Sequence, residues 1–164
     1  MKNIAFIGTS HIHTPNFISK VISNIKINCI GVWDKDKNRS KIDSDKLQCK
    51  NYDNYVDLLK EPNLDGVIVC SETNLHYELV KKITENKKHC FIEKPLGIGK
   101  KDSFEMANLI ESSKIIFQTG YFMRSNPVYI KLKELITANY FGEISRIRLA
   151  VSYTHLTLPT NGTV

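Results

Sequence analysis

The chain has 164 residues, of which 41% are hydrophobic and 24% charged, which is enough for one domain with a hydrophobic core. Its net charge of +6 comes from scattered lysines without a basic stripe or an interleaved aromatic platform, so no nucleic-acid partner is expected. No apolar run is long enough to span a bilayer, and the first residues lead into a strand pattern rather than a signal peptide, so we expect a cytoplasmic protein without a membrane partner.

Short apolar runs alternate with helical patterns through most of the chain. This alternation predicts an α/β fold, a doubly wound parallel sheet of the Rossmann type with strand order 3-2-1-4-5-6. We expect strands over residues 4–7, 28–33, 47–49, 66–70, 90–92 and 115–118, and helices over 16–24, 38–42, 52–60, 74–85 and 102–112. Thr73 is expected to cap the fourth of these helices, residues 74–85.

The pattern changes after Gly120. Residues 127–139 carry apolar side chains at helical spacing, and residues 144–149 show an imperfect strand alternation. We therefore expect one more helix and one more strand in this part of the chain.

The four cysteines lie far apart, with no C-x-x-C pair, so a zinc site built from them is not expected. Three fall within predicted strands and one lies near a strand, which favours buried free thiols in a cytoplasmic protein. They are Cys29, Cys49, Cys70 and Cys90.

A turn with one glycine follows the first predicted strand, where a dinucleotide-binding domain carries G-x-G-x-x-G. Gly8 serves the tight turn, whereas Ser10 and His13 replace the second and third glycines. The following helix N-terminus can still receive a diphosphate, and Ser10, His11 and Ile12 can offer backbone N–H groups to it.

An acidic residue, Asp34, closes the second predicted strand. A carboxylate at this position accepts hydrogen bonds from ribose hydroxyls and repels a 2′-phosphate, which favours NAD over NADP. Arg39 is the counter-evidence, because a nearby arginine can accommodate that phosphate. The alternative interpretation is that Asp34 only opens a turn with Asp36.

Glu93-Lys94-Pro95 ends the fifth predicted strand, at the sheet edge where open α/β sheets bind ligands. The ammonium group of Lys94 can polarise a carbonyl or orient an alcohol there, and Pro95 makes the turn rigid. The alternative is a surface lysine before a turn proline.

Several short motifs occur in a fixed order over residues 1–149. In this order they resemble the Gfo/Idh/MocA family of nicotinamide-dependent oxidoreductases. The matching stretches are Ile4-Ala5-Phe6-Ile7-Gly8, Val32-Trp33-Asp34, residues 65–70 with Thr73-Asn74-Leu75-His76, Glu93-Lys94-Pro95-Leu96, Gly120-Tyr121 with Arg124 and Asn126-Pro127, residues 132–136, and Phe141-Gly142-Glu143-Ile144.

The resemblance implies hydride transfer between a nicotinamide cofactor and a sugar, cyclitol or related hydroxy or keto compound. The residues carried over are Ser71, Thr73, Asn74 and His76 for the cofactor, Glu93 and Lys94 for the cofactor and for catalysis, and Lys94 with Arg124 for the small-molecule substrate. For His76 the alternative is local packing in a helix, and for Arg124 it is a surface ion pair. The family usually has a proline where Glu72 stands.

The resemblance also implies a domain layout. Residues 1–122 form the dinucleotide-binding domain, and residues 123–150 begin a truncated α+β domain for substrate binding and dimerisation. Family members are about twice as long and commonly homo-oligomeric, and their acid/base residues lie further downstream. We therefore expect this chain to be an inactive, truncated form of the enzyme.

The last stretch, residues 151–164, matches one reading frame of a transposase adapter used in preparing sequencing libraries, and we expect it to be non-native.

Two alternative functions remain open. His11-Ile12-His13 after a first strand is also how metal-dependent hydrolase barrels begin, with two imidazoles on one ion. The chain can also be an NAD-binding regulatory module without turnover. Against the first stands the lack of further convincing ligands, so no metal is expected.

Overall fold

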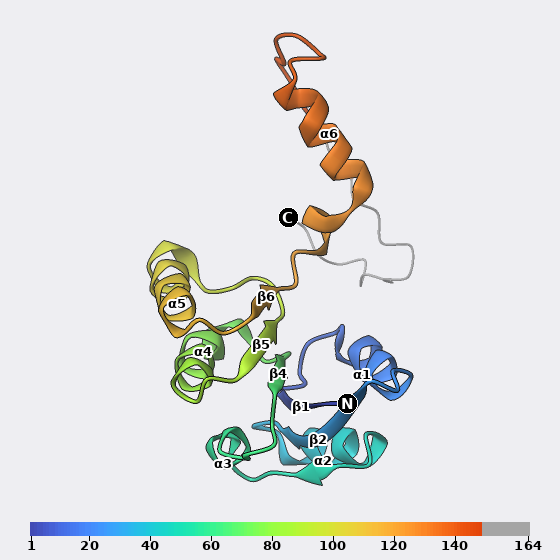
Figure 1. Cartoon of the computed structure of the whole chain (residues 1–164), viewed down its shortest axis with the longest axis vertical. Helices are drawn as coiled ribbons and strands as arrows, with labels where there is room; N and C mark the ends of the chain where they lie inside the picture. Colours follow the sequence, from blue (N-terminus) through green and yellow to red (C-terminus); the bar gives the residue numbers. More distant parts are fainter. Residues whose placement is uncertain (149–164) are drawn as a thin grey trace, which may run out of the picture. The chain divides into compact units, whose positions relative to one another are not determined.

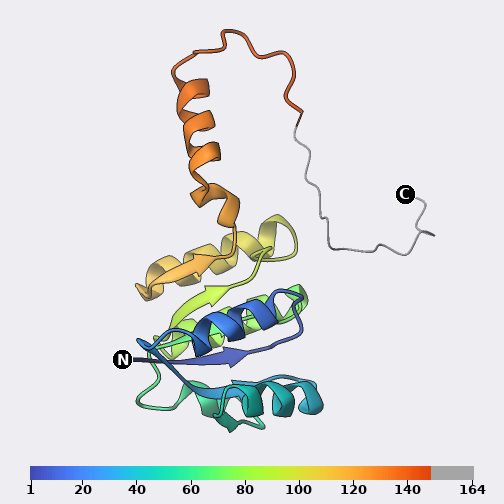
Figure 2. The ribbon, with the colours of Figure 1, turned by 90° about the vertical axis from the view of Figure 1, so that its right-hand side faces the viewer.

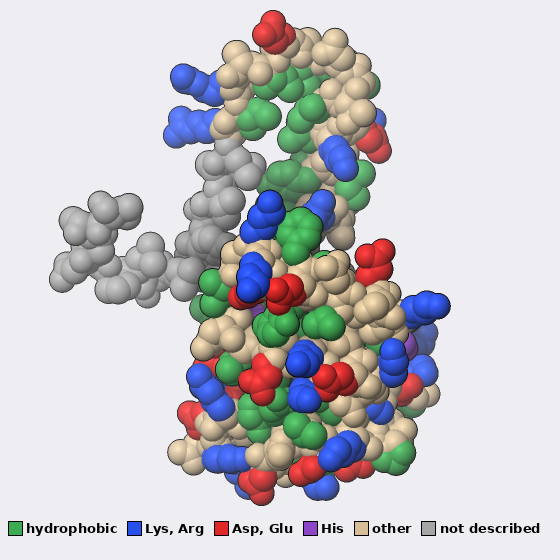
Figure 3. Space-filling model, turned by 90° about the vertical axis from the view of Figure 1, so that its left-hand side faces the viewer, with side chains coloured by type: hydrophobic (Ala, Val, Ile, Leu, Met, Phe, Trp, Pro, Cys, Tyr) green, Lys and Arg blue, Asp and Glu red, His purple; other side chains and the backbone are tan. Residues whose placement is uncertain are grey.

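The computed structural model describes residues 1–148. The chain divides into one unit over Met1–Phe122 and a second unit that begins at Met123. No helix of the described residues is long and apolar enough to cross a membrane. On the face drawn in Figure 3, basic and acidic side chains are interspersed over the first unit.

The first unit is built on a six-stranded sheet whose paired strands are all parallel, in the order β3-β2-β1-β4-β5-β6. This confirms the predicted order. The central strand pairs on both sides, since Phe6 lies opposite Val32 on one neighbour and Ile68 on the other. The strands are β1 (Lys2–Ile7), β2 (Ile27–Trp33), β3 (Lys50–Asn51), β4 (Gly66–Val69), β5 (His89–Ile92) and β6 (Phe117–Thr119).

Helices cover both faces of this sheet (Figures 1 and 2). They are α1 (Thr14–Ile22), α2 (Lys37–Lys46), α3 (Tyr55–Leu59), α4 (His76–Glu85) and α5 (Gly99–Ser113), with a 3-10 turn η1 (Thr73–Leu75) before α4. On one face Ile18 and Val21 of α1 pack with Phe6 and Val32. The larger core lies on the other face and includes Ile7, Val69, Leu79, Ile83 and Met106. Burying each such side chain stabilises the fold by about 1.5–3 kcal/mol.

Local hydrogen bonds explain where the helices differ from the prediction. The Asp36 side chain accepts from the N–H groups of Asn38 and Arg39 at 2.9 and 3.1 Å. This cap starts α2 at Lys37, and the helix ends after Lys46, where Gln48 has φ +51° and Cys49 N–H donates to the Ser44 carbonyl oxygen at 3.0 Å. The helix is longer than predicted, so β3 forms after residues 47–49 rather than within them. Asn54 caps α3 through a 2.9 Å bond from Val56 N–H, so that helix starts later than predicted.

The predicted capping role of Thr73 is wrong. Thr73 lies inside η1, and the residue before α4 is Leu75, which has no side-chain capping bond. The 3-10 turn satisfies this end instead, because Leu75 N–H donates to the Glu72 carbonyl oxygen at 3.0 Å.

All four cysteines are free, and two of them depart from the prediction. Cys70 and Cys90 are buried, whereas Cys29 and Cys49 are only half-buried near the β3 edge of the sheet. The sulfur atoms of Cys29 and Cys49 lie 3.7 Å apart.

The 3-10 turn η2 (Phe122–Ser125) begins at the last residue of the first unit, and helix α6 (Pro127–Thr137) belongs to the second unit. Asn126 caps α6 by accepting from Val128 N–H at 2.9 Å. The strand predicted over 144–149 is absent from residues 144–148, because the described part of this unit has no neighbouring strand to pair with. The predicted non-native tail, residues 151–164, lies outside the described residues.

Candidate functional site

The carboxyl ends of the parallel strands bring most predicted site residues to one edge of the sheet. Gly8 follows β1, Asp34 follows β2, Ser71 lies two residues beyond β4, and Lys94 follows β5 closely. The chain changes direction across the sheet between β1 and β4, which is the position where open α/β sheets bind ligands.

The turn after β1 requires glycine at its first position. Gly8 has φ +75°, and a Cβ there would lie 2.4 Å from the Cβ of Ser71. Both the left-handed backbone and the close approach to Ser71 therefore exclude a side chain. The turn is tied to β4 because Cys70 N–H donates to the Gly8 carbonyl at 3.2 Å.

Two of the three predicted amide donors of this turn remain available. His11 N–H donates to the Cys70 carbonyl oxygen at 3.0 Å, so it is already used. Among residues 1–148, no acceptor lies in hydrogen-bonding position for the backbone N–H of Ser10 or Ile12. Helix α1 starts directly after this turn, with His13 as its N-cap. A diphosphate at this helix end would thus be held by two amides rather than three.

Asp34 is 1% exposed, and both oxygens of its carboxylate accept hydrogen bonds from other groups of the protein. It accepts from the backbone N–H of Thr9 at 2.6 Å and of Asp36 at 2.8 Å. Arg39 donates through Nε at 3.1 Å and Nη2 at 2.8 Å. Burial acts to raise the pKa of Asp34, but the Arg39 guanidinium and the two amides outweigh it and hold the pKa below its usual value.

This arrangement matches the turn interpretation of Asp34, because the Asp36 N–H bond closes a local turn. It differs from the prediction of a carboxylate open to ribose hydroxyls. For Asp34 to accept from a ribose, the Arg39 side chain, which is 32% exposed, has to move aside.

The loop after β4 presents a mixed set of groups. Ser71 is buried under Gly8, Thr73 is half-buried, and Asn74 is exposed. Glu72, which replaces the family's usual proline, forms a 2.8 Å ion pair with Lys35. Burial acts to raise the pKa of Glu72, but Lys35 and the backbone N–H of Glu72 together outweigh it and hold the pKa below its usual value. The ion pair ties this loop to the one that follows β2.

His76 is a buried structural residue. It is 1% exposed, and its Nδ1 lies 3.0 Å from the Pro95 carbonyl oxygen and 3.1 Å from that of Leu96. Its Nε2 lies 3.4 Å from the Ser71 carbonyl oxygen. The local-packing alternative for His76 therefore fits this structure better than direct cofactor contact, and the ring positions the loop after β5.

Glu93 and Lys94 face different surroundings. The Glu93 carboxylate is buried, and its Oε2 accepts from the Lys94 backbone N–H at 2.9 Å. Lys94 is exposed, and its Nζ has no hydrogen-bond or ion-pair partner within residues 1–148. The Lys94–Pro95 peptide bond is cis. The free ammonium group leaves Lys94 available to an incoming ligand.

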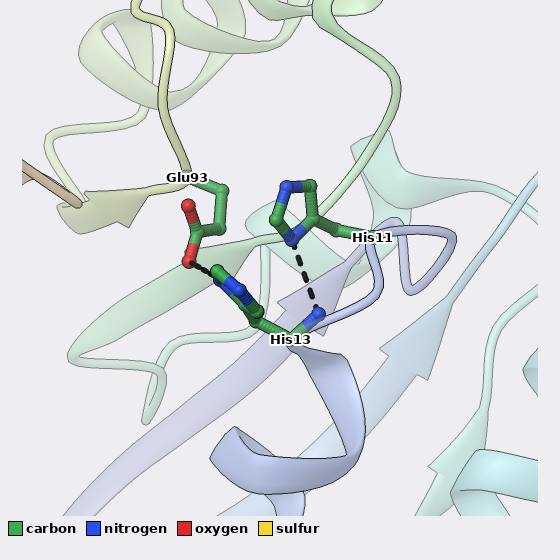
Figure 4. A group of neighbouring side chains, drawn as sticks. All are labelled: His11, His13 and Glu93. Carbon is green, nitrogen blue, oxygen red and sulfur yellow. Dashed lines mark hydrogen bonds and ion pairs between the residues drawn. The ribbon is translucent and has the colours of Figure 1, made fainter. Parts of the chain in front are cut away.

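The contact between Glu93 and His13 was missed by the sequence analysis. Glu93 Oε1 lies 3.2 Å from His13 Nδ1, and His11 Nδ1 accepts from His13 N–H at 3.2 Å (Figure 4). The sequence separates Glu93 from His13 by 80 residues, and only their common position at strand ends could have suggested the contact. Arg124 lies in η2, whereas the other predicted site residues belong to the first unit.

Comparison with known proteins adds independent findings. Residues 2–121 match the model of an oxidoreductase family with an NAD-binding Rossmann fold. The chain is 27% identical over 144 residues, 85% of its length, to an inositol 2-dehydrogenase/D-chiro-inositol 3-dehydrogenase of Lactiplantibacillus plantarum, of which it covers 39%. It is 36% identical over 100 residues, 61% of its length, to a myo-inositol 2-dehydrogenase of Thermotoga maritima, of which it covers 30%.

Among solved structures, a probable dehydrogenase from Thermotoga maritima is similar with a TM-score of 0.72 and 30% sequence identity. That match covers 85% of this chain and 42% of the other. The chain thus spans less than half the length of the relatives it matches.

Proposed function

Because this chain belongs to the oxidoreductase family with an NAD-binding Rossmann fold, we propose that it is the cofactor-binding part of an NAD-dependent dehydrogenase. Its substrate would be a sugar, a cyclitol or a related hydroxy or keto compound. The observation that carries the proposal is the Gly8 turn and α1 N-terminus at the switch point between β1 and β4. The names of two relatives, both inositol dehydrogenases, support a cyclitol.

The residues at this edge fit a dinucleotide. Gly8 keeps side chains out of the turn, so a diphosphate can approach the amides of Ser10 and Ile12. Asp34 and Arg39 together would meet the adenosine ribose. The groups that would line the rest of the cofactor are those of Thr73, Asn74 and Lys94, which are exposed or half-buried, and that of Glu93, which is buried.

NAD, when bound, supplies the hydride acceptor. The exposed ammonium of Lys94 would hold the substrate oxygen, polarising a carbonyl or orienting an alcohol for proton transfer. Glu93 would hold the backbone of Lys94 through the 2.9 Å bond to its N–H. Arg124 would contact the substrate, whose pocket and proton-transfer partner we assign to the part of the relatives that this chain does not span. Our proposal includes a cytoplasmic location, a homo-oligomeric form at the relatives' full length, and no nucleic-acid partner.

A binding titration of the chain with NADH tests the proposal. Trp33, the single tryptophan, precedes Asp34 at the proposed ribose site, so energy transfer from Trp33 to the reduced nicotinamide reports binding. We expect saturable transfer that NAD and ADP-ribose compete away. Absence of saturation at millimolar NADH, with a folded protein, would overturn the proposal.

The matched control compares two glycines with positive φ. Gly8→Ala should abolish binding, because its Cβ would meet Ser71 at 2.4 Å. Gly99 has φ +80°, but no atom lies within 4 Å of the position that a Cβ would take there, so Gly99→Ala should retain binding. A version spanning the relatives' whole length, assayed for NADH formation from inositols, separates a dehydrogenase from a binding module without turnover.

A further inference from the structure

We propose that His11, His13 and Glu93 form a binding site for a divalent transition-metal ion, and that zinc suits this ligand set best. The inference goes beyond NAD binding, and it depends on side chains rather than on the backbone amides of the turn. The proposed metal site does not make the protein a metal-dependent hydrolase, because the fold around the site is that of the dinucleotide-binding family.

The fold brings three ligand atoms together from two distant segments. His11 and His13 lie in the turn between β1 and α1, and Glu93 directly follows β5. One ligand atom from each residue lies within 4.8 Å of the other two, and Figure 4 shows the carboxylate facing the His13 ring. Two imidazoles and one carboxylate are the ligands of His₂Glu zinc sites.

The separation of His13 and Glu93 already matches a coordination edge. Zinc bonds to nitrogen and oxygen are about 2.0–2.2 Å long, so two ligands at a tetrahedral angle lie roughly 3.3–3.5 Å apart. His13 Nδ1 and Glu93 Oε1 are 3.2 Å apart. An ion can thus replace the proton that these two atoms share, with little movement of either side chain.

Glu93 is preorganised as a ligand. Its side chain is 4% exposed, and its other oxygen, Oε2, accepts from the Lys94 backbone N–H at 2.9 Å. This outer bond fixes the direction of the carboxylate, as outer-shell hydrogen bonds do in metal sites. A buried carboxylate also needs a positive partner, which a divalent ion supplies more strongly than an imidazole.

His11 is available as the third ligand. The His11 ring is half-buried and lies edge-on to the His13 ring, with 4.8 Å between the two ring centroids. An imidazole binds a metal through a ring nitrogen in its neutral form. If His11 binds the metal through Nδ1, it loses the hydrogen bond that this nitrogen accepts from His13 N–H. That bond is 3.2 Å long, at the long end of the range for N–H donors.

The ligand types select the ion. Two nitrogen ligands disfavour magnesium and calcium, which prefer all-oxygen sites. Three protein ligands leave the fourth tetrahedral position open to water or to an oxygen atom of a bound molecule, as in catalytic zinc sites. His13 keeps 43% of its side chain exposed, so an ion can enter from solvent.

Zinc titration by calorimetry and cobalt absorption spectroscopy test the site on the chain freed of metal by a chelator. We expect stoichiometric zinc binding and a cobalt spectrum of nitrogen and oxygen ligands. His13→Asn, which can still cap α1, and Glu93→Gln, which keeps the shape of the side chain, should each weaken zinc about tenfold or more. Thermal melts of the metal-free variants check that both fold.

Two control variants address other ligands in the chain. His89→Ala/His155→Ala removes histidines outside the cluster, and Cys29→Ser/Cys49→Ser removes the neighbouring thiols. Both should keep the wild-type zinc affinity. The proposal is overturned if wild-type zinc binding is undetectable, survives both cluster substitutions, or is lost only with the thiols. NADH titration of the metal-free chain tests the proposed function separately.

Discussion

The Arg39 guanidinium lies across the Asp34 carboxylate, with Nε 3.1 Å from Oδ2 and Nη2 2.8 Å from Oδ1. This two-pronged pair places an acidic and a basic group together after β2, where the adenosine ribose of a dinucleotide is recognised. An acid at this position favours a free 2′-hydroxyl and a base tolerates a 2′-phosphate, so we propose that this pair sets the balance between NAD and NADP.

We predict that the chain binds NAD more tightly than NADP. A 2′-phosphate would bring negative charge up to the buried carboxylate of Asp34, whereas a 2′-hydroxyl is neutral and can donate a hydrogen bond to it. Arg39→Ala removes the group that can bind a phosphate with two hydrogen bonds, so it should reduce NADP affinity further, by about tenfold, and change NAD affinity less. Parallel titrations with both cofactors measure this, and equal or tighter NADP binding by the wild type would contradict the assignment of Asp34.

The same pair should give the fold a defined acid sensitivity. The folded pKa of Asp34 lies below its usual value of about 3.9. Its stabilising contribution is therefore fully present above that value and is lost as the pH falls through the folded pKa. Asp34→Asn should lower the free energy of unfolding by about 1–3 kcal/mol at pH 7, because Arg39 and the Thr9 amide lose a charged acceptor.

Urea unfolding of wild type and Asp34→Asn from about pH 7 to about pH 2 checks this, and the difference between them should shrink below about pH 4. Glu111→Gln, at an exposed carboxylate on α5, is the control and should change stability by less than about 0.5 kcal/mol. A difference that stays constant down to the lowest pH would contradict the linkage.

Parallel strands are the part of this structure that a single sequence predicts well. Runs such as Gly66–Val69 and His89–Ile92 are short and apolar because both faces of the sheet are covered. Helix α2 was harder to predict, since its apolar content is low and its start depends on the Asp36 side chain. Local hydrogen bonding, rather than hydrophobic spacing, sets its length.

The sequence predicted where the residues of the candidate site lie in the fold, but it did not predict the contacts between their side chains. Gly8, Asp34 and Lys94 could be placed at one sheet edge because each follows a strand. The Arg39 bonds to Asp34, the burial of His76 and the contact between His13 and Glu93 depend on side-chain directions and on loops up to 80 residues apart. No periodicity in the sequence encodes these.

His76 should stabilise the loop after β5 rather than bind the cofactor. We predict that His76→Ala lowers the free energy of unfolding by about 2–4 kcal/mol, because it leaves a cavity and removes the donor to the Pro95 and Leu96 carbonyls. His76→Gln, whose amide can donate to a carbonyl, should recover part of that loss.

Denaturant unfolding measures these differences, with the exposed His89→Ala as a control expected to cost far less. NADH affinity of the folded His76→Gln protein should stay close to that of the wild type. A large loss of affinity in a variant of normal stability would instead indicate direct cofactor contact.

The chain should bind NAD without turning over a cyclitol. Lys94 is present and its ammonium is exposed, but it can polarise or orient the substrate oxygen only when a bound substrate is held against it. The relatives are more than twice as long as the stretch that matches this chain, and we assign the substrate pocket to the remainder. NADH formation from myo-inositol should therefore remain at the background level given by the Lys94→Ala variant.

Deleting Val151–Val164, the segment interpreted as non-native, should leave both NADH affinity and thermal stability unchanged. Turnover clearly above that background, or a loss of affinity or stability on deletion, would show that the chain is functionally complete and that its last residues belong to the protein.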